Sequence, residues 1–209
     1  EPLLLARVAP TMVARNRAAG ARRLLENDVD FVIMDDGFQS RRLFFDYALI
    51  ALDARRGLGN GAVIPAGPVR APVIDQMRHA DGLLRIGDGP GGVAVVRAAA
   101  RAAKPVLRAD LVPGKLEGIT DEPLLAFSGI GDPGKFFDTL TAAGYTVGSR
   151  RSFSDHHVFT DAEAKELVDR ARAENLVPVT TEKDAVRLSR LNGPIAELRE
   201  MTRVLPVSL

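Results

Sequence analysis

The sequence predicts an α/β protein built from parallel strands. Apolar runs of strand length alternate with helix-like segments along most of the 209 residues, and this alternation is typical of parallel strands joined by crossover helices. The first strong run, Val29 to Met34, is apolar except for Asp30. Such a run is expected of a strand that is covered on both faces. Two aspartates, Asp35 and Asp36, follow directly.

The strand and helix pattern stops and then restarts near the middle of the chain. We therefore predict a first unit at 1–104, an extended linker at 105–120 that contains Pro113-Gly114, and a smaller second unit at 121–209. In the first unit we expect a helix at 9–26, strands at 29–34, 47–53 and 81–86, and a helix at 93–103. In the second we expect strands at 124–127, 145–150, 177–180 and 201–207, and helices at 133–143, 161–174 and 183–191, with Thr160 as an N-cap.

Composition limits the functions to consider. The chain carries 46% hydrophobic and 26% charged residues with a net charge of +1, so nothing global demands nucleic acid or an acidic partner. It has no cysteine, which excludes disulfides and thiolate chemistry. No apolar run reaches the length of about 18 residues that a membrane span requires.

The two aspartates after the first strand are the first candidate site. Ligands of open α/β sheets bind beyond the carboxyl ends of the strands, and carboxylate oxygens suit Mg²⁺. Asp35 and Asp36 could therefore hold a cation near the phosphates of a nucleotide. The alternative is that Asp35-Asp36-Gly37 is simply a polar turn.

Two glycine-rich segments also resemble phosphate loops. Gly129 to Lys135 satisfies the Walker A spacing, but Phe136 stands where Ser or Thr should bind Mg²⁺, and Pro133 removes a backbone donor. We favour a tight strand-to-helix turn there. Gly57 to Gly61 lacks the following helix of a dinucleotide fingerprint, although Arg70 beyond it could pair with a phosphate or lie in solvent.

Two polar segments in the second unit could carry further chemistry. Asp155, His156 and His157 precede a helix, and a carboxylate beside an imidazole can orient it as a base. A structural loop histidine and a zinc site are the alternatives, with zinc the weakest because no cysteine is present. Lys183 could reach a phosphate, whereas Thr181 before it is a fair N-cap.

These motifs occur together in one order that resembles the tetraacyldisaccharide 4′-kinase family. The order is Asp-Asp-Gly-Phe-Gln, Gly-x-Gly-Asn-Gly with Pro-Ala-Gly-Pro-x-Arg, Gly-Ile-Gly-x-Pro with Phe-Phe, Phe-x-Asp-His-His, and Thr-Glu-Lys-Asp-Ala-Val. The resemblance implies a P-loop NTPase-like sheet lobe with a smaller α/β lobe. It also implies transfer of phosphate from ATP, with Mg²⁺, to the 4′-hydroxyl of a lipid A precursor at the cytoplasmic face of the bacterial inner membrane.

The resemblance also implies roles for particular residues. Asp35, Asp36 and Gln39 match the Mg²⁺ and nucleotide ligands, and Arg70 matches a phosphate or substrate contact. Lys183 stays a candidate substrate contact on its own position. His156, with Asp155 beside it, matches the group that helps to deprotonate the sugar hydroxyl. The family usually has His where this chain has Ser40 and often Glu where it has Ala71, and both differences bear on metal affinity.

The start of the chain, Glu1-Pro2-Leu3-Leu4-Leu5, resembles an internal segment of the family. The resemblance therefore implies that the Walker A loop, a membrane-contacting segment and the acidic partner of His156 precede Glu1. On that basis we expect the 209 residues alone to show no turnover. The alternatives are a non-catalytic substrate- or metal-binding fragment and an unrelated nucleotide enzyme that uses Gly129 to Lys135.

Overall fold

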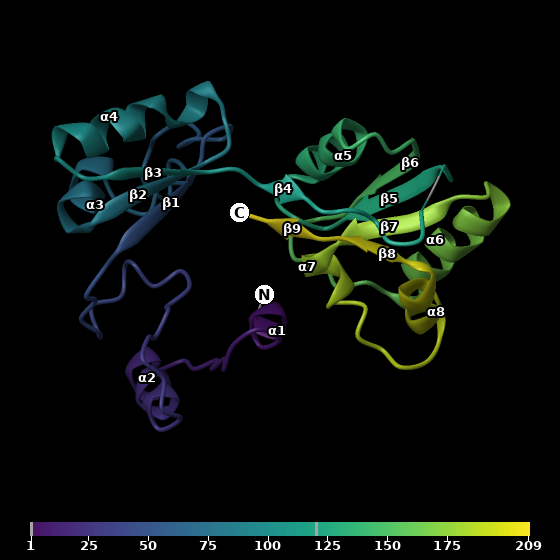
Figure 1. Ribbon diagram of the computed structural model, residues 1–209, viewed down its shortest axis with the longest axis horizontal. Helices are drawn as coiled ribbons and strands as arrows, with labels where there is room; N and C mark the ends of the chain where they lie inside the picture. The colour runs from purple at the N-terminus through teal and green to yellow at the C-terminus, as the bar shows by residue number, and fades with distance from the viewer. Residues whose placement is uncertain (1, 120) are drawn as a thin grey trace. The chain divides into compact units, whose positions relative to one another are not determined.

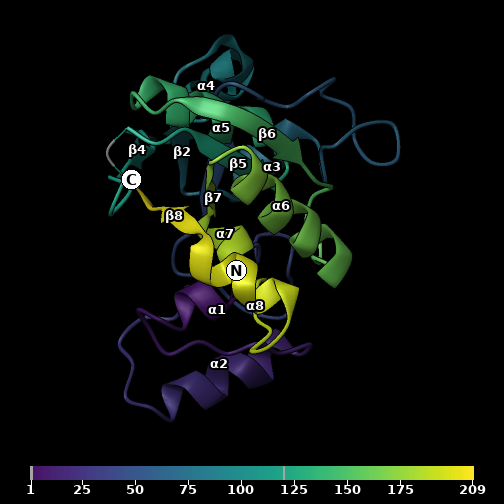
Figure 2. The same ribbon diagram turned by 90° about the vertical axis from the view of Figure 1, so that its right-hand side faces the viewer.

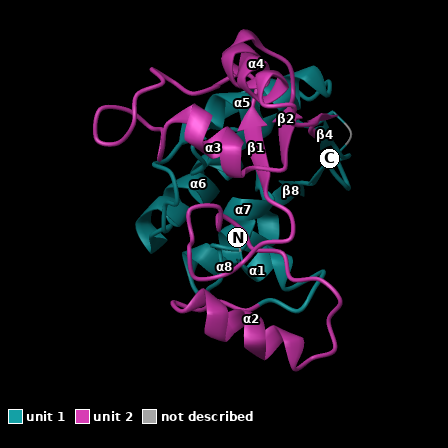
Figure 3. Ribbon diagram, turned by 90° about the vertical axis from the view of Figure 1, so that its left-hand side faces the viewer, with its two compact units in different colours: residues 1–11, 112–208 teal, residues 12–111, 209 magenta. Residues whose placement is uncertain are grey.

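The computed structural model describes residues 2–119 and 121–209, which divide into two compact units. The N-terminal unit contains residues 12–111, and the C-terminal unit contains residues 112–208 together with the start of the chain up to residue 11, including the short helix α1 (Pro2–Leu5) (Figure 3). The predicted α/β class is confirmed, because each unit contains a parallel sheet covered by helices. Each unit is described separately below.

The N-terminal unit is built on a three-stranded parallel sheet in the order β1-β2-β3. Leu52, Leu83 and Val95 pack in its core with Met77 and Ala99. Its elements are α2 (Arg17–Leu25), β1 (Leu49–Asp53), α3 (Val73–His79), β2 (Gly82–Ile86), the 3-10 turn η1 (Pro90–Gly92), α4 (Val93–Arg101) and β3 (Val106–Ala109) (Figure 1). The strands predicted at 47–53 and 81–86 and the helix at 93–103 are thus confirmed to within a few residues. Helix α3 and strand β3 were not predicted.

The predicted buried strand at 29–34 is wrong. Residues 31–34 belong to no strand, and the side chains of Phe31 and Ile33 are 87% and 93% exposed. An apolar run becomes a buried strand only where a neighbouring backbone pairs with it and other elements cover both faces. Within the described residues, the sheet of this unit contains only β1, β2 and β3. The helix predicted at 9–26 is also shorter, because Asn16 caps its start by accepting a hydrogen bond from the Ala19 amide.

The C-terminal unit has a four-stranded parallel sheet in the order β6-β5-β7-β8 (Figure 2). Every residue of β5 is buried. Its elements are β4 (Val112–Pro113), β5 (Leu124–Ser128), α5 (Pro133–Ala142), β6 (Val147–Ser152), α6 (Asp161–Ala173), β7 (Val177–Thr181), α7 (Glu182–Ala185), α8 (Pro194–Met201), β8 (Arg203–Leu205) and β9 (Val207–Ser208). β4 and β9 form a separate antiparallel pair.

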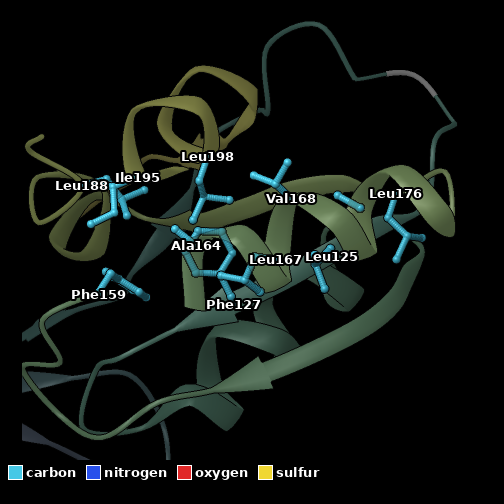
Figure 4. Packing of buried hydrophobic residues seen from close by; sticks show 11 residues of the cluster. Leu125, Phe127, Phe159, Ala164, Leu167, Val168, Leu176, Leu188, Ile195 and Leu198 are labelled. Carbon is cyan, nitrogen blue, oxygen red and sulfur yellow. The ribbon is translucent and has the colours of Figure 1, made fainter. Parts of the chain in front are cut away.

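Both faces of this sheet are covered, as the apolar sequences of β5 and β7 require. Leu125 and Phe127 of β5 point toward α6 and α8, where they pack with Leu167 and Leu198 (Figure 4). Leu124 and Ala126 alternate to the other face and pack with side chains of α5. Because successive side chains of a strand point to opposite faces, β5 contributes residues to the hydrophobic cores on both faces of the sheet.

Most predicted elements of this unit are confirmed, and one helix is wrong. Helix α6 begins after Thr160, whose side chain and backbone form a capping box with Glu163. The helix predicted at 183–191 is instead the short α7, followed by turns and by α8. α7 ends at Ala185, within the predicted helix, and α8, which begins at Pro194 after Gly193 with a φ of 82°, was not predicted. The strand expected at 201–207 is reduced to β8, while β9 begins at Val207.

Among the residues that the structure describes, none of the helices combines the length and apolar character needed to cross a bilayer.

Candidate functional site

The aspartates after the predicted first strand lie in a turn that Arg70 holds. The guanidinium of Arg70 donates from Nη1 to Oδ1 of Asp36 at 2.6 Å and from Nη2 to Oδ2 at 2.9 Å. Nη1 also donates to Oε1 of Gln39 at 3.2 Å. The hydrogen bond and the charge of Asp36 raise the pKa of Arg70 above its ordinary value, so this guanidinium stays positively charged. Arg70 therefore holds Asp36 and Gln39 together, although it lies 34 positions after Asp36 and 31 positions after Gln39.

Oxygen donors at this turn match the chemistry of Mg²⁺, which prefers carboxylate and amide oxygens. Asp36 and Gln39 direct three oxygens at the same guanidinium, and Asp35 is exposed beside them. Within the described residues no group of three or more His, Cys, Asp or Glu side chains is clustered to hold a metal ion. These oxygens are therefore of the type that binds Mg²⁺, and in this structure they accept hydrogen bonds from the positively charged Arg70.

A basic hollow of about 310 Å³ lies next to this turn. It is lined by Arg15, Arg17, Gln39, Ser40, Arg41 and Arg42. Arg17 also donates to the backbone oxygen of Asp36 at 3.3 Å. Four guanidinium groups around one hollow attract an anion, and planar guanidinium groups suit phosphate oxygens in particular. The prediction from sequence singled out Asp35, Asp36 and Gln39 but none of these arginines. Arg15 and Arg17 precede the motif by about twenty positions, so only the fold shows that they lie beside it.

The two adjacent histidines of the C-terminal unit occupy different environments. His157 stacks on Phe153 with ring centroids 4.8 Å apart, meets Phe159 edge to face, and its Nε2 lies 3.0 Å from Oε2 of Glu163. His156 is 69% exposed, and its Nε2 lies 3.9 Å from Oδ2 of Asp155. His157 is therefore a packing residue, and His156 is the imidazole that is accessible to a ligand.

A buried network of charged and polar groups around Asp184 is linked to His156 through Arg187. Asp184 is fully buried and is bound by Ser128, by the amide of Gly129, by Thr181 and by Arg187. Arg187 in turn lies 3.2 Å from Nδ1 of His156. The prediction from sequence named Lys183 as a phosphate contact and did not find Asp184 or Arg187, since an Asp and an Arg three residues apart resemble an ordinary surface pair.

The Walker A-like segment of this unit is a strand-to-helix turn, as favoured from its sequence. The Gly129 amide donates to Oδ2 of Asp184 at 3.0 Å, and the Lys135 amide donates to Oδ1 of Asp132, which caps α5. A phosphate loop offers its backbone amides to the ligand. Here the amides at the first and last residues of the segment donate to carboxylates of the chain instead.

Comparison with known proteins agrees with the motif order. The family model described as LpxK, tetraacyldisaccharide-1-P 4′-kinase, matches residues 1–209. Tetraacyldisaccharide 4′-kinases of Chelativorans sp. and Sinorhizobium fredii are 51% and 50% identical to this chain over 207 and 212 residues. That of Agrobacterium fabrum is 49% identical over 209 residues. These alignments cover 99–100% of this chain and 60% of each relative, so the chain spans about 60% of the length of the curated relatives it matches.

A crystal structure of LpxK from Aquifex aeolicus in complex with ATP is similar to this chain with a TM-score of 0.62 and 24% sequence identity. The similarity covers 99% of this chain and 62% of that one. It shows a shared fold, which agrees with the predicted α/β class. The match of the family model along the whole chain is more specific than the fold. This chain belongs to the tetraacyldisaccharide-1-P 4′-kinase family.

Proposed function

We propose that the protein to which this chain belongs transfers the γ-phosphate of ATP to the 4′-hydroxyl of a tetraacyldisaccharide 1-phosphate, a precursor of lipid A. The observation that carries the proposal is the family match over all 209 residues, together with identities near 50% to relatives that bear the name of this activity. The chemistry of two groups of residues supports it, one in each unit. ATP and Mg²⁺ are the proposed cofactors.

The turn at Asp36 and the basic hollow beside it suit the nucleotide end of the reaction. Phosphoryl transfer depends on positioning and on charge neutralisation more than on covalent chemistry. We propose that Asp35, Asp36 and Gln39 hold Mg²⁺ and orient the phosphates, with the arginines of the hollow nearby. Bound Mg²⁺ supplies positive charge to the phosphate oxygens. Arg70 pairs bidentately with Asp36 and could exchange this carboxylate for a phosphate of the same geometry.

His156 suits the acceptor end of the reaction. Its ring is exposed, whereas the neighbouring His157 is packed between aromatic rings. We propose that His156, with Asp155 beside it, contacts the sugar hydroxyl and helps its deprotonation. Lys183 is proposed as a further contact to a phosphate of the substrate, since it lies in the first turn of the short helix that also carries Asp184.

The proposed substrate also defines where the protein works. Four acyl chains hold such a lipid in a bilayer, because each buried methylene adds about 0.8 kcal/mol to membrane binding. We propose a peripheral position at the cytoplasmic face of the bacterial inner membrane, where ATP is available. No nucleic acid and no obligate protein partner belong to this proposal.

The test is a transfer assay with the protein expressed from the gene that encodes this chain. Detergent-solubilised tetraacyldisaccharide 1-phosphate, Mg²⁺ and ATP labelled in the γ-phosphate should yield a labelled lipid whose new phosphate is at the 4′ position by mass spectrometry. A lipid already phosphorylated at the 4′ position is the control and should remain unlabelled. Absence of labelled product from the free 4′-hydroxyl, with protein that is folded and binds ATP, would refute the proposal.

A further inference from the structure

The buried carboxylate of Asp184 is saturated with donors. Ser128 Oγ, the Gly129 amide and Thr181 Oγ1 donate to its Oδ2 at 2.9, 3.0 and 2.9 Å. Arg187 Nη1 donates to its Oδ1 at 2.8 Å. A fully buried charge is tolerated only when it is paired and hydrogen-bonded in this way. Asp184 is therefore a fixed anchor at the carboxyl ends of β5 and β7.

This anchor determines where the guanidinium of Arg187 lies. Nη1 of Arg187 donates both to Asp184 and to the backbone oxygen of Gly129 at 2.9 Å. The side chain is only 17% exposed. Because the guanidinium is planar and rigid, two contacts at Nη1 also fix the direction of Nη2, which lies 3.2 Å from Nδ1 of His156.

His156 is also fixed through its backbone. It has a φ of 58°, which is uncommon for a residue other than glycine. Its amide donates to the backbone oxygen of Gly129 and to Oδ1 of Asp155, at 3.0 Å in each case. The same Gly129 oxygen thus binds both the His156 amide and Arg187, so the imidazole and the guanidinium have one common reference point.

The contact between Arg187 and His156 determines which ring nitrogen carries the proton. Guanidinium nitrogens can only donate, so Nδ1 must accept, and a neutral imidazole then carries its hydrogen on Nε2. We propose that Arg187 is a positioning residue that selects the Nε2–H tautomer of His156 and directs this N–H outward. Asp184 acts through Arg187 by holding the guanidinium in place.

The tautomer refines the role of His156, and in this respect the inference rests on the proposed function. With its hydrogen on Nε2, the exposed nitrogen has no lone pair for the proton of a sugar hydroxyl. It can instead donate a hydrogen bond to the hydroxyl oxygen, which orients that oxygen and stabilises the negative charge that develops on it. His156 then helps deprotonation as a hydrogen-bond donor.

The test is ¹⁵N NMR of this chain labelled in histidine. The spectra are recorded near pH 8, about 1.5 units above the ordinary pKa of imidazole, and long-range correlations distinguish protonated from unprotonated ring nitrogens. The chain has three histidines, and His156→Gln identifies the His156 signals by their loss. We expect a protonated Nε2 and an unprotonated Nδ1. A neutral ring with its proton on Nδ1 would overturn the proposal. A protonated Nε2 agrees with it, and a variant then tests whether Arg187 is the cause.

Arg187→Met tests the cause of the tautomer. Removal of the donor should allow the Nδ1–H tautomer to become partly populated, visible as movement of the two His156 resonances toward each other. Arg190→Met is the matched control, because Arg190 pairs with Asp161 rather than with a histidine, and it should leave the resonances unchanged. An unchanged tautomer in folded Arg187→Met would also overturn the proposal. Neither spectrum requires ATP or lipid, so failure here is distinct from failure of the transfer assay.

Discussion

Arg70 and Asp36 form a bidentate ion pair, in which Nη1 of the guanidinium donates to Oδ1 at 2.6 Å and Nη2 donates to Oδ2 at 2.9 Å. The pair joins the turn after residue 34 to the end of the loop that precedes α3. Both side chains are half exposed or more, so the pair costs little to separate and contributes little to folding. Its value is the alignment of a carboxylate and a guanidinium that could each bind a ligand of the proposed kinase.

Substitution of Asp36 should separate function from stability. Because the pair is exposed, Asp36→Asn should change the free energy of unfolding by less than about 1 kcal/mol in urea denaturation. Phosphate transfer by the protein that contains the chain should fall by about 10²-fold or more, since a proposed ligand of the Mg²⁺ that neutralises the phosphates is lost. Asp75→Asn, which removes the exposed partner of Arg78 in the same unit, should alter neither quantity appreciably. Equal loss of activity in the two variants would contradict the assignment of Asp36.

The adjacent histidines should respond oppositely to substitution. His157→Gln should lower the free energy of unfolding by about 1–2 kcal/mol, because it removes a stacked ring and a charge-assisted hydrogen bond to Glu163. His156→Gln should lower it by less than about 0.5 kcal/mol, as for most exposed positions, yet reduce kcat of the proposed transfer by about 10²–10³-fold. Chemical denaturation and the transfer assay measure the two effects. The reverse order would assign the catalytic role to His157.

Glu163 should make the stability of the C-terminal unit depend on acid pH. Partial burial raises the pKa of this carboxyl, but hydrogen bonds from the backbone of Thr160, from His157 and from the Thr160 hydroxyl outweigh that effect and lower the pKa to about 2. The unfolded chain, with an ordinary value of 4.5, therefore takes up the proton first as pH falls. The stabilisation is fully present above pH 4.5 and is lost progressively toward pH 2.

Glu163→Gln measures this dependence. The amide retains an oxygen for the capping box, so the variant should be less stable by about 1–2 kcal/mol at pH 6 and should converge with the wild type near pH 2. Glu166→Gln is the control on the same helix, because its carboxylate is exposed and lies 3.6 Å from Arg151. Parallel stability curves for the wild type and Glu163→Gln from pH 6 to 2 would show that this carboxylate does not carry the effect.

A side chain at Gly129 should destabilise the C-terminal unit. A Cβ there would lie 3.0 Å from Cβ of His157 and 3.1 Å from the backbone oxygen of Ser154. Gly129→Ala should therefore cost about 1–3 kcal/mol of unfolding free energy, as expected for overpacking. Gly134→Ala is the control, because the Cβ would meet only Oδ1 of Asp132 at 3.4 Å and alanine favours the helix. Equal midpoints in thermal denaturation would show that the loop of His156 can move to accommodate the methyl group.

Local signals in the sequence determined most of the C-terminal unit. The apolar run at 124–127, the Thr160 cap and the alternation of strands and helices each act over a few residues, so β5, α6 and β7 could be predicted from the residues that form them. The order of five motifs was specific enough to indicate the family. Each of these inferences depends either on residues that are close together in the sequence or on the order of motifs along the chain.

Only the tertiary structure decided the features that depend on partners far along the chain. The run at 29–34 has the sequence of a buried strand, but burial depends on neighbours, and Phe31 and Ile33 are exposed in the structure. The pairing of Asp36 with Arg70 likewise joins residues that are 34 positions apart. The contact of His156 with Arg187 joins residues that are 31 positions apart. Sequence specifies which groups can donate, accept or pack, whereas distance in space, set by packing of the whole unit, decides which of them meet.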